Sequence, residues 1–167
     1  YCGAGRDEYG PIALDNASFT PPANPLAADA RVDIAKANLN AHLIAYITAH
    51  PETQFDIFFP PYSAAEWATM ESKGTLEAML TLRGLCCDML SGYDNVTIYD
   101  FAARADWVLD LNNYKDTLHY GQWINDAITE CIARGENVVS SRETLDAATA
   151  QLRAWADAQI EAGGWVF

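Results

Sequence analysis

The chain has 167 residues; half are hydrophobic and 11% are aromatic, which suffices for one domain with a core and excludes a disordered chain. Its formal net charge is −13, from 23 acidic and 10 basic residues. Binding to nucleic acid or to an anionic membrane needs clustered Lys and Arg, so this balance argues against both partners. No stretch approaches the roughly 20 apolar residues that cross a bilayer, and no transmembrane segment is expected.

The first 28 residues contain three Gly and four Pro, which predicts an extended N-terminal segment (residues 1–28) with little regular structure. The chain opens on Tyr1 rather than Met, and it carries no signal peptide. We therefore expect a processed or partial form of a longer protein.

A helix and then a strand are predicted next. Between residues 29 and 49, apolar side chains recur at the spacing of one helix face, and Pro51 ends this helix. Residues 54–59, Gln-Phe-Asp-Ile-Phe-Phe, are aromatic and β-branched and are stopped by Pro60 and Pro61. This composition predicts a buried strand.

A second helix and a second strand follow. Helical spacing continues over residues 64–90, with a break expected near Gly74. Gly92 and Asn95 then turn the chain into residues 96–99, Val-Thr-Ile-Tyr, which have the composition of a strand.

Two more helices are predicted towards the C-terminus. The first contains Trp123 and Cys131 and is closed by Gly135. For the second, Ser140 and Glu143 have the spacing of a capping box at a helix start.

The predicted order of elements indicates an α/β fold, because strands separated by helices pair in parallel through right-handed crossovers. Two strands are too few for a usual sheet, and parallel strands need cover on both faces. Residues 29–167 are thus expected to be the C-terminal portion of a single helix-rich α/β domain, with further strands on the N-terminal side.

The four cysteines have no spacing typical of a zinc site, so neither a bound metal nor a cofactor is expected. Cys86 and Cys87 lie within a helical pattern, where buried thiols are expected; a redox or metal protein built on this pair is disfavoured. A disulfide from Cys2 stays open, because the sequence does not fix the redox environment.

The most informative residues are Asp116 and His119, on a polar loop between the second strand and the following helix. A histidine that acts as a general base needs a carboxylate to hold its tautomer and to stabilise the imidazolium. Solvated side chains on a surface loop are the alternative. Ligands of such folds bind outside the carboxyl ends of the strands, so Tyr62 and Ser63, after the first strand, are expected in the same cleft.

Two roles are open for Ser63. It lacks the Gly-flanked elbow that exposes a nucleophilic serine, and capping of the following helix is favoured. His42 and His50 are assigned to structural positions within and at the end of a helix. The tryptophans are expected to pack in the core or at its edge rather than to form a sugar platform: Trp67, Trp107, Trp123 and Trp155.

Together, several segments resemble the C-terminal half of SGNH (GDSL-like) hydrolase-fold proteins, most of all a little-characterised group from Gram-positive bacteria. The segments are Phe55 to Ser63, Trp67, Asn112 to Asp116, His119 to Gly121 and Ile124 to Asn125, within a similarity over about residues 30–160. The resemblance implies a flavodoxin-like three-layer α/β/α sandwich with a parallel sheet. It implies Asp116 and His119 as the catalytic acid and base. Tyr62, Ser63 and Tyr120 are expected to be substrate-binding residues.

The nucleophilic serine of such proteins lies in the first half of the domain, and no G-D-S or G-x-S-x-T block follows an early strand here. The leading hypothesis is an SGNH-like serine esterase or O-acyltransferase that acts on an acyl ester of a small molecule or a cell-envelope glycan. The upstream half of the same protein would supply the serine, and this chain alone is expected to be inactive. The alternative is a non-catalytic binding or scaffold domain. The resemblance implies an extracytoplasmic or cell-surface bacterial location, and a cytoplasmic one stays open.

Overall fold

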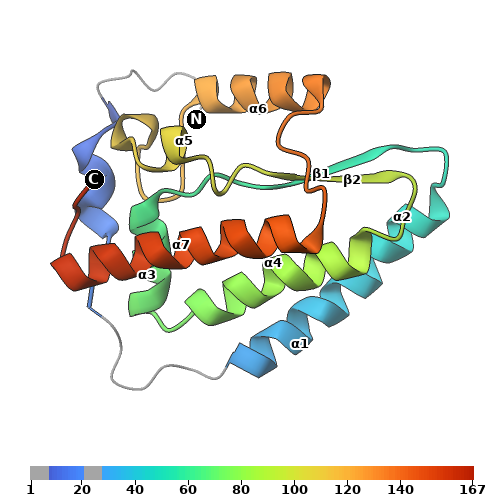
Figure 1. Cartoon of the computed structure of the whole chain (residues 1–167), viewed down its shortest axis with the longest axis horizontal. Helices are drawn as coiled ribbons and strands as arrows, with labels where there is room; N and C mark the ends of the chain where they lie inside the picture. The colour runs from blue at the N-terminus through green and yellow to red at the C-terminus, as the bar shows by residue number, and fades with distance from the viewer. Residues whose placement is uncertain (1–7, 21–27) are drawn as a thin grey trace.

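The computed structural model describes residues 8–20 and 28–167. In chain order these form η2 (3-10 helix, Pro11–Asn16), α1 (Ala28–Asn38), η3 (π-helix, Leu39–Ile44), α2 (Ala45–Ala49), β1 (Phe55–Phe59), α3 (Ala64–Ser72), α4 (Leu76–Leu90), β2 (Val96–Asp100), α5 (Ala105–Val108), η4 (3-10 helix, Leu111–Asn113), α6 (Gln122–Arg134) and α7 (Arg142–Ala162). Helices lie on both sides of the short sheet, with α6 on one side and α1, α4 and α7 on the other (Figure 1).

The two strands pair in parallel, in a register that begins with Phe55 opposite Val96. This confirms the pairing expected for strands that are separated by helices. Within residues 8–20 and 28–167 the sheet contains only β1 and β2. The chain beyond α6 returns to the outer edge of β2, where Val138 forms an antiparallel bridge with Tyr99. The fold is therefore a helix-rich α/β arrangement around a small parallel sheet.

Strand β1 is less buried than its composition predicted. None of its five residues is buried, and Phe58 is 38% exposed. The backbone of Phe55 and of Phe59 is hydrogen-bonded towards β2 and the chain that continues from it. Because bonding directions alternate along a strand, the backbone groups of Asp56 and Phe58 face the opposite edge. No strand of the described part of the chain pairs there. The predicted strand is therefore present, but the expectation that it is buried was wrong.

The helix predicted over residues 29–49 is present, but its middle turn, η3, is a π-helix rather than an α-helix. Periodicity does not reveal such a turn, because a π turn only displaces the apolar face around the axis. The break predicted near Gly74 is confirmed. Helix α3 ends at Ser72, α4 begins at Leu76, and Gly74 between them has a φ of +65°, which favours glycine.

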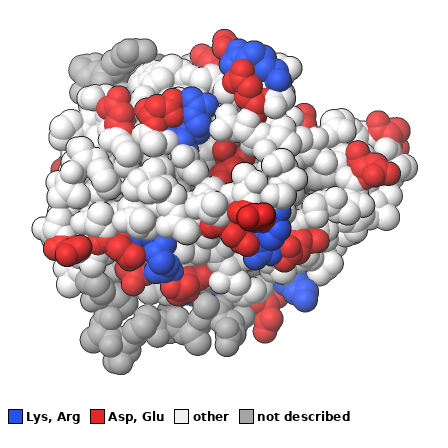
Figure 2. Space-filling view, in the orientation of Figure 1, with Lys and Arg blue, Asp and Glu red and all other residues white. Residues whose placement is uncertain are grey.

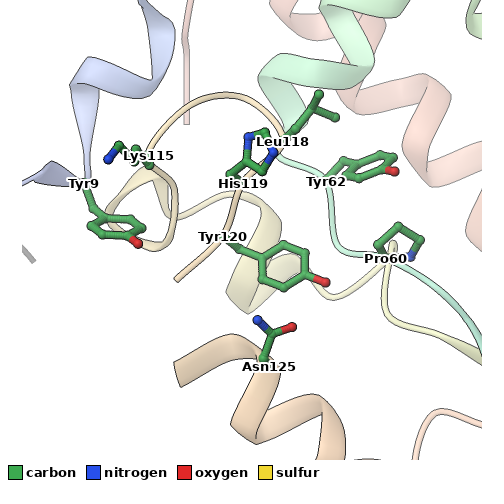
Figure 3. Close-up of a pocket in the computed structure, with 8 residues that line it drawn as sticks. All are labelled: Tyr9, Pro60, Tyr62, Lys115, Leu118, His119, Tyr120 and Asn125. Carbon is green, nitrogen blue, oxygen red and sulfur yellow. The ribbon is translucent and has the colours of Figure 1, made fainter. Parts of the chain in front are cut away.

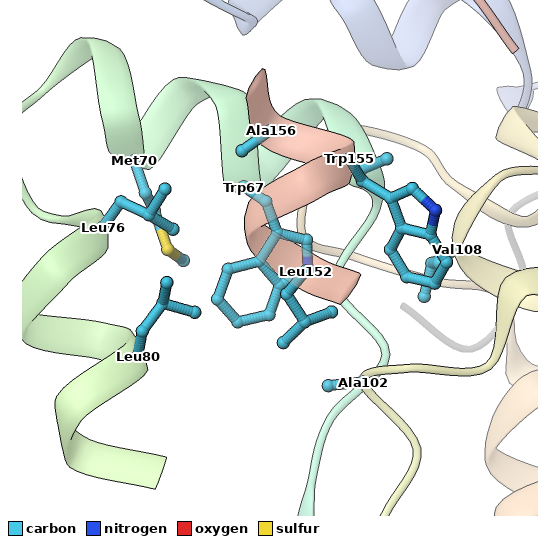
Figure 4. Packing of buried hydrophobic residues seen from close by; sticks show 10 residues of the cluster. Trp67, Met70, Leu76, Leu80, Ala102, Val108, Leu152, Trp155 and Ala156 are labelled. Carbon is cyan, nitrogen blue, oxygen red and sulfur yellow. The ribbon is translucent and has the colours of Figure 1, made fainter. Parts of the chain in front are cut away.

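The largest hydrophobic core lies where α3, α4 and α7 meet (Figure 4). Trp67 of α3 and Trp155 of α7 are buried in it together with Leu152, which has no exposed surface. Trp107 packs in a second cluster with Phe101 beneath α6. These three tryptophans confirm the expectation of core packing. The contact between α3 and α7 also holds the start of α3, where the loop after β1 ends.

The starts and ends of the last two helices test the capping predictions. Gly135 closes α6, as predicted, and it does so in the left-handed conformation. The N-cap of α7 is Ser141 rather than Ser140: Ser141 Oγ accepts a hydrogen bond from Thr144 N at 3.2 Å. Both serines offer a hydroxyl, so the spacing to Glu143 selected the wrong one by a single residue.

The N-terminal segment is not extended throughout. Residues Pro11–Asn16 form the short helix η2, and Ala13 in it has no exposed surface. Gly10 N donates a hydrogen bond to Tyr114 O at 3.0 Å, which ties this segment to the loop after β2. Residues 17–20 have no regular structure, and residues 1–7 and 21–27 of the predicted segment lie outside the described residues.

Three of the four cysteines lie in the described residues. All three are free thiols, and Cys87 and Cys131 are buried. The expectation of buried thiols at Cys86 and Cys87 is confirmed for Cys87, whereas Cys86 is half-buried. Burial raises the pKa of Cys86 and of Cys87, which favours the protonated form. Cys2 lies outside the described residues. Across residues 8–20 and 28–167, no group of three or more His, Cys, Asp or Glu side chains is arranged to hold a metal ion.

Charged side chains are dispersed over the surface. On the face in Figure 2, basic side chains lie beside acidic ones and form no continuous basic patch. Arg142, for example, pairs with Asp88 and Asp146, and Arg153 pairs with Glu77. None of the helices that residues 8–20 and 28–167 form is long and apolar enough to cross a membrane.

Candidate active site

Asp116 and His119 form a hydrogen-bonded pair. His119 Nδ1 lies 2.6 Å from Asp116 Oδ2. The other carboxylate oxygen, Oδ1, accepts from the backbone N–H groups of Leu118 at 2.9 Å and of His119 at 2.7 Å. An Asp side chain that bonds the backbone two and three residues ahead fixes a turn locally. Both carboxylate oxygens of Asp116 are therefore engaged in orienting His119.

The turn sits at the tip of a narrow loop. Tyr114 and Tyr120 form an antiparallel bridge, and Lys115 N donates to His119 O at 3.0 Å. At the base of the loop the buried hydroxyl of Tyr114 donates to Pro61 O at 2.6 Å. The loop after β2 is thereby attached to the loop after β1, as predicted for segments at the carboxyl ends of parallel strands.

The electrostatics of Asp116 favour its charged form. Partial burial opposes ionisation, but the hydrogen bonds from the backbone and ring of His119 and from Leu118 N outweigh it and hold the pKa of Asp116 below its ordinary value. A carboxylate that stays ionised can hold the Nδ1 proton of His119 and can stabilise a positive charge on its ring.

A cavity of about 420 Å³ opens beside His119 (Figure 3). Its wall combines aromatic, apolar and hydrogen-bonding side chains: Tyr9, Pro60, Tyr62, Lys115, Leu118, His119, Tyr120 and Asn125. These residues come from the N-terminal segment, the loop after β1, the loop that carries Asp116, and α6. Such a concave site with a few polar groups suits a small ligand or one residue of a larger one.

Tyr62 and Tyr120, both predicted as substrate-binding residues, line this cavity with His119. Burial raises the pKa of both phenols; proximity to Glu66 adds to the effect for Tyr62, and proximity to Tyr62 adds to it for Tyr120. Both hydroxyls therefore keep their protons at neutral pH and can donate hydrogen bonds to a ligand.

Ser63 does not reach the cavity. It has no exposed surface, its Oγ accepts from Glu66 N at 3.2 Å, and its hydroxyl donates to Thr117 O at 2.8 Å. Ser63 is thus the N-cap of α3, the role that the sequence favoured. Its assignment as a substrate-binding residue was wrong, because the residue that caps a helix start turns its hydroxyl back onto the chain.

Five cavity residues were not among the predicted site residues: Tyr9, Pro60, Lys115, Leu118 and Asn125. Tyr9 reaches the site because η2 packs on the loop after β2, a contact between distant parts of the chain. It also contacts Trp123 edge to face, with ring centroids 4.9 Å apart. Asn125 falls one turn into α6, and its place in the resemblance to SGNH proteins was the only signal for it. His50 lies at the end of α2 with Nδ1 3.5 Å from Glu52, in the structural position that was expected.

Comparison of the chain with protein-family models, with curated proteins and with solved structures found no match. The geometry of the site is therefore the basis for its function.

Proposed function

We propose that this chain supplies the acid–base pair of an SGNH-like serine esterase or O-acyltransferase. The observation that carries the proposal is the 2.6 Å contact between His119 Nδ1 and Asp116 Oδ2 beside a 420 Å³ cavity at the carboxyl end of β1. An acid on Nδ1 selects the tautomer in which Nε2 takes up a proton, as acyl-transfer chemistry requires.

In this proposal His119 takes the proton of a serine hydroxyl as the serine oxygen attacks the ester carbonyl carbon. Asp116 stabilises the imidazolium that results, and His119 then gives the proton to the departing alcohol. Water would release the acyl group in an esterase, and a second hydroxyl would accept it in an acyltransferase. The substrate is an acyl ester of a small molecule or of a cell-envelope glycan, at an extracytoplasmic or cell-surface location.

The serine and the oxyanion donors would come from an upstream half of the same protein. The exposed edge of β1 supports this part of the proposal. Its sequence, Phe-Asp-Ile-Phe-Phe, is typical of a strand covered on both faces, yet none of its residues is buried in the described structure. A further parallel strand on that edge would extend the sheet towards the three-layer sandwich of SGNH proteins and cover Phe58.

Substitution of His119 by Ala tests the proposal, in the protein that includes its upstream half and with an aryl acetate as substrate. Loss of a general base lowers turnover about 10²- to 10⁴-fold. His50→Ala is the matched control, because His50 lies outside the cavity at the end of α2. Turnover that is unchanged in His119→Ala would remove His119 from the mechanism.

A second candidate function is a non-catalytic binding or scaffold domain. The observation that favours it is the composition of the cavity wall, which contains no Ser, Thr or Cys side chain among the described residues. The upstream sequence separates the two candidates: a block with a nucleophilic serine supports the enzyme, and its absence supports the binding domain.

A further inference from the structure

Thr117, the residue between Asp116 and Leu118, is held by three hydrogen bonds to the start of α3. Its carbonyl oxygen accepts from Ser63 N at 3.2 Å and from Ser63 Oγ at 2.8 Å. Its hydroxyl donates to a carboxylate oxygen of Glu66 in a very short contact. Thr117 and Glu66 are 5% and 7% exposed, so this contact is shielded from water.

The start of α3 explains why Glu66 is available to Thr117. Ser63 and Glu66 have capping-box spacing, in which the serine hydroxyl accepts from the glutamate N–H and the glutamate carboxylate accepts from the serine N–H. The first bond is present, with Glu66 N donating to Ser63 Oγ at 3.2 Å. In place of the second, Ser63 N donates to Thr117 O, and the Glu66 carboxylate accepts from the Thr117 hydroxyl. Thr117 thus satisfies both groups, Ser63 N–H and the Glu66 carboxylate, that would bond each other in a complete capping box.

The burial of Glu66 has an energetic cost. Desolvation raises its pKa, the hydrogen bond from Thr117 and the charge of Lys73 oppose that rise, and the charge of Asp116 adds to it. A carboxylate buried in this way destabilises the fold relative to an apolar residue, so its presence points to a role for the hydrogen bond to Thr117 that an apolar residue could not fill.

We propose that Glu66 is a positioning residue for the Asp116–His119 pair and acts through Thr117. The bond to Glu66 fixes Thr117, and Thr117 carries the turn in which Asp116 bonds Leu118 N, His119 N and His119 Nδ1. Misplacement of a catalytic pair by about 1 Å lowers turnover about 10²-fold, so this attachment sets the efficiency of His119. The catalytic part of the inference rests on the proposed function; the structural part does not.

The structural part is tested by hydrogen exchange, measured by NMR on this chain, of the Leu118 and His119 amides that bond Asp116. Loss of a hydrogen bond to a buried carboxylate opens the turn, and exchange in Glu66→Ala is expected to be about 10- to 100-fold faster. Glu66→Gln keeps an oxygen acceptor and is expected to restore most of the protection. Glu71→Ala is the matched control, because Glu71 lies on the same helix and its side chain makes no hydrogen bond to the loop in the described structure; it is expected to leave the exchange unchanged.

Thr117→Val gives an independent measurement, because it removes the hydroxyl and keeps the shape of the side chain. It is expected to match Glu66→Ala, and the double variant to match either single one. If Glu66→Ala does not fold, Thr117→Val decides alone. Protection that is retained in Thr117→Val, or lost equally in Glu71→Ala, overturns the inference.

The two proposals fail separately. In the protein with its upstream half, Glu66→Ala is expected to lower kcat for an aryl acetate with little change in KM, and Glu66→Gln to recover most of kcat. If the exchange rates respond as expected while His119→Ala leaves turnover unchanged, the proposed function falls and the positioning role of Glu66 stands.

Discussion

Ser63→Ala measures how strongly the start of α3 holds the loop that carries Asp116 and His119. The substitution removes two hydrogen bonds of a fully buried side chain: the cap bond from Glu66 N and the bond to Thr117 O. Loss of an N-cap costs about 1 kcal/mol. Loss of the second bond adds about 1 kcal/mol, because Thr117 O keeps its bond from Ser63 N and is not left unpaired.

The free energy of unfolding of Ser63→Ala is therefore expected to fall by about 2 kcal/mol, which lowers Tm by about 4–8 °C for a chain of this length. Urea unfolding followed by circular dichroism measures the first quantity, and thermal unfolding the second. Ser141→Ala is the control, because Ser141 caps α7 at an exposed position without a bond to a distant loop, and its cost is about 1 kcal/mol. If both variants lose the same stability, the bond from Ser63 to Thr117 contributes nothing and the loop is not held there.

Two further predictions concern the charge of Asp116 and the core beneath the site. The pKa of Asp116 is lowered on folding, so the charged carboxylate stabilises the fold above the unfolded pKa of about 4, and this stabilisation is lost as pH falls through the folded pKa. Asp116→Asn should therefore unfold with a lower free energy than the wild type at pH 7, and urea titrations should show this deficit shrink below about pH 4. An equal deficit at all pH values would refute the prediction. Leu152→Ala removes a side chain with no exposed surface from the core of α3, α4 and α7. Its free energy of unfolding, measured in urea, is expected to be about 2–5 kcal/mol lower than that of the wild type. A decrease of less than about 1 kcal/mol would show that the cluster repacks around the smaller side chain.

Much of the fold was predictable because its signals are local. Apolar spacing located the helices, and the conformational freedom of glycine located the break at Gly74 and the end of α6 at Gly135. The π-helix η3 and the choice of Ser141 as the cap of α7 were not predictable, since both differ from the expected structure by a single turn or residue.

The candidate site divides in the same way. The contact between Asp116 and His119 joins residues three positions apart, and the sequence predicted it. The bond from Thr117 to Glu66 joins residues 51 positions apart. The sequence around Thr117 and Glu66 does not predict this contact, because it depends on how α3 packs against the sheet. The approach of Tyr9 to the cavity was missed for the same reason.

The two edges of the sheet differ in a way that limits how chains can assemble. The returning segment around Val138 occupies the outer side of β2 near Tyr99, while the outer side of β1 has no partner strand in the described part of the chain. Fibres grow by edge pairing when each molecule offers two open edges, one to accept a neighbour and one to pass the contact on. A molecule with one open edge can pair with only one copy of itself: when β1 of one copy pairs with β1 of another, both open edges are used and assembly between copies stops at a pair.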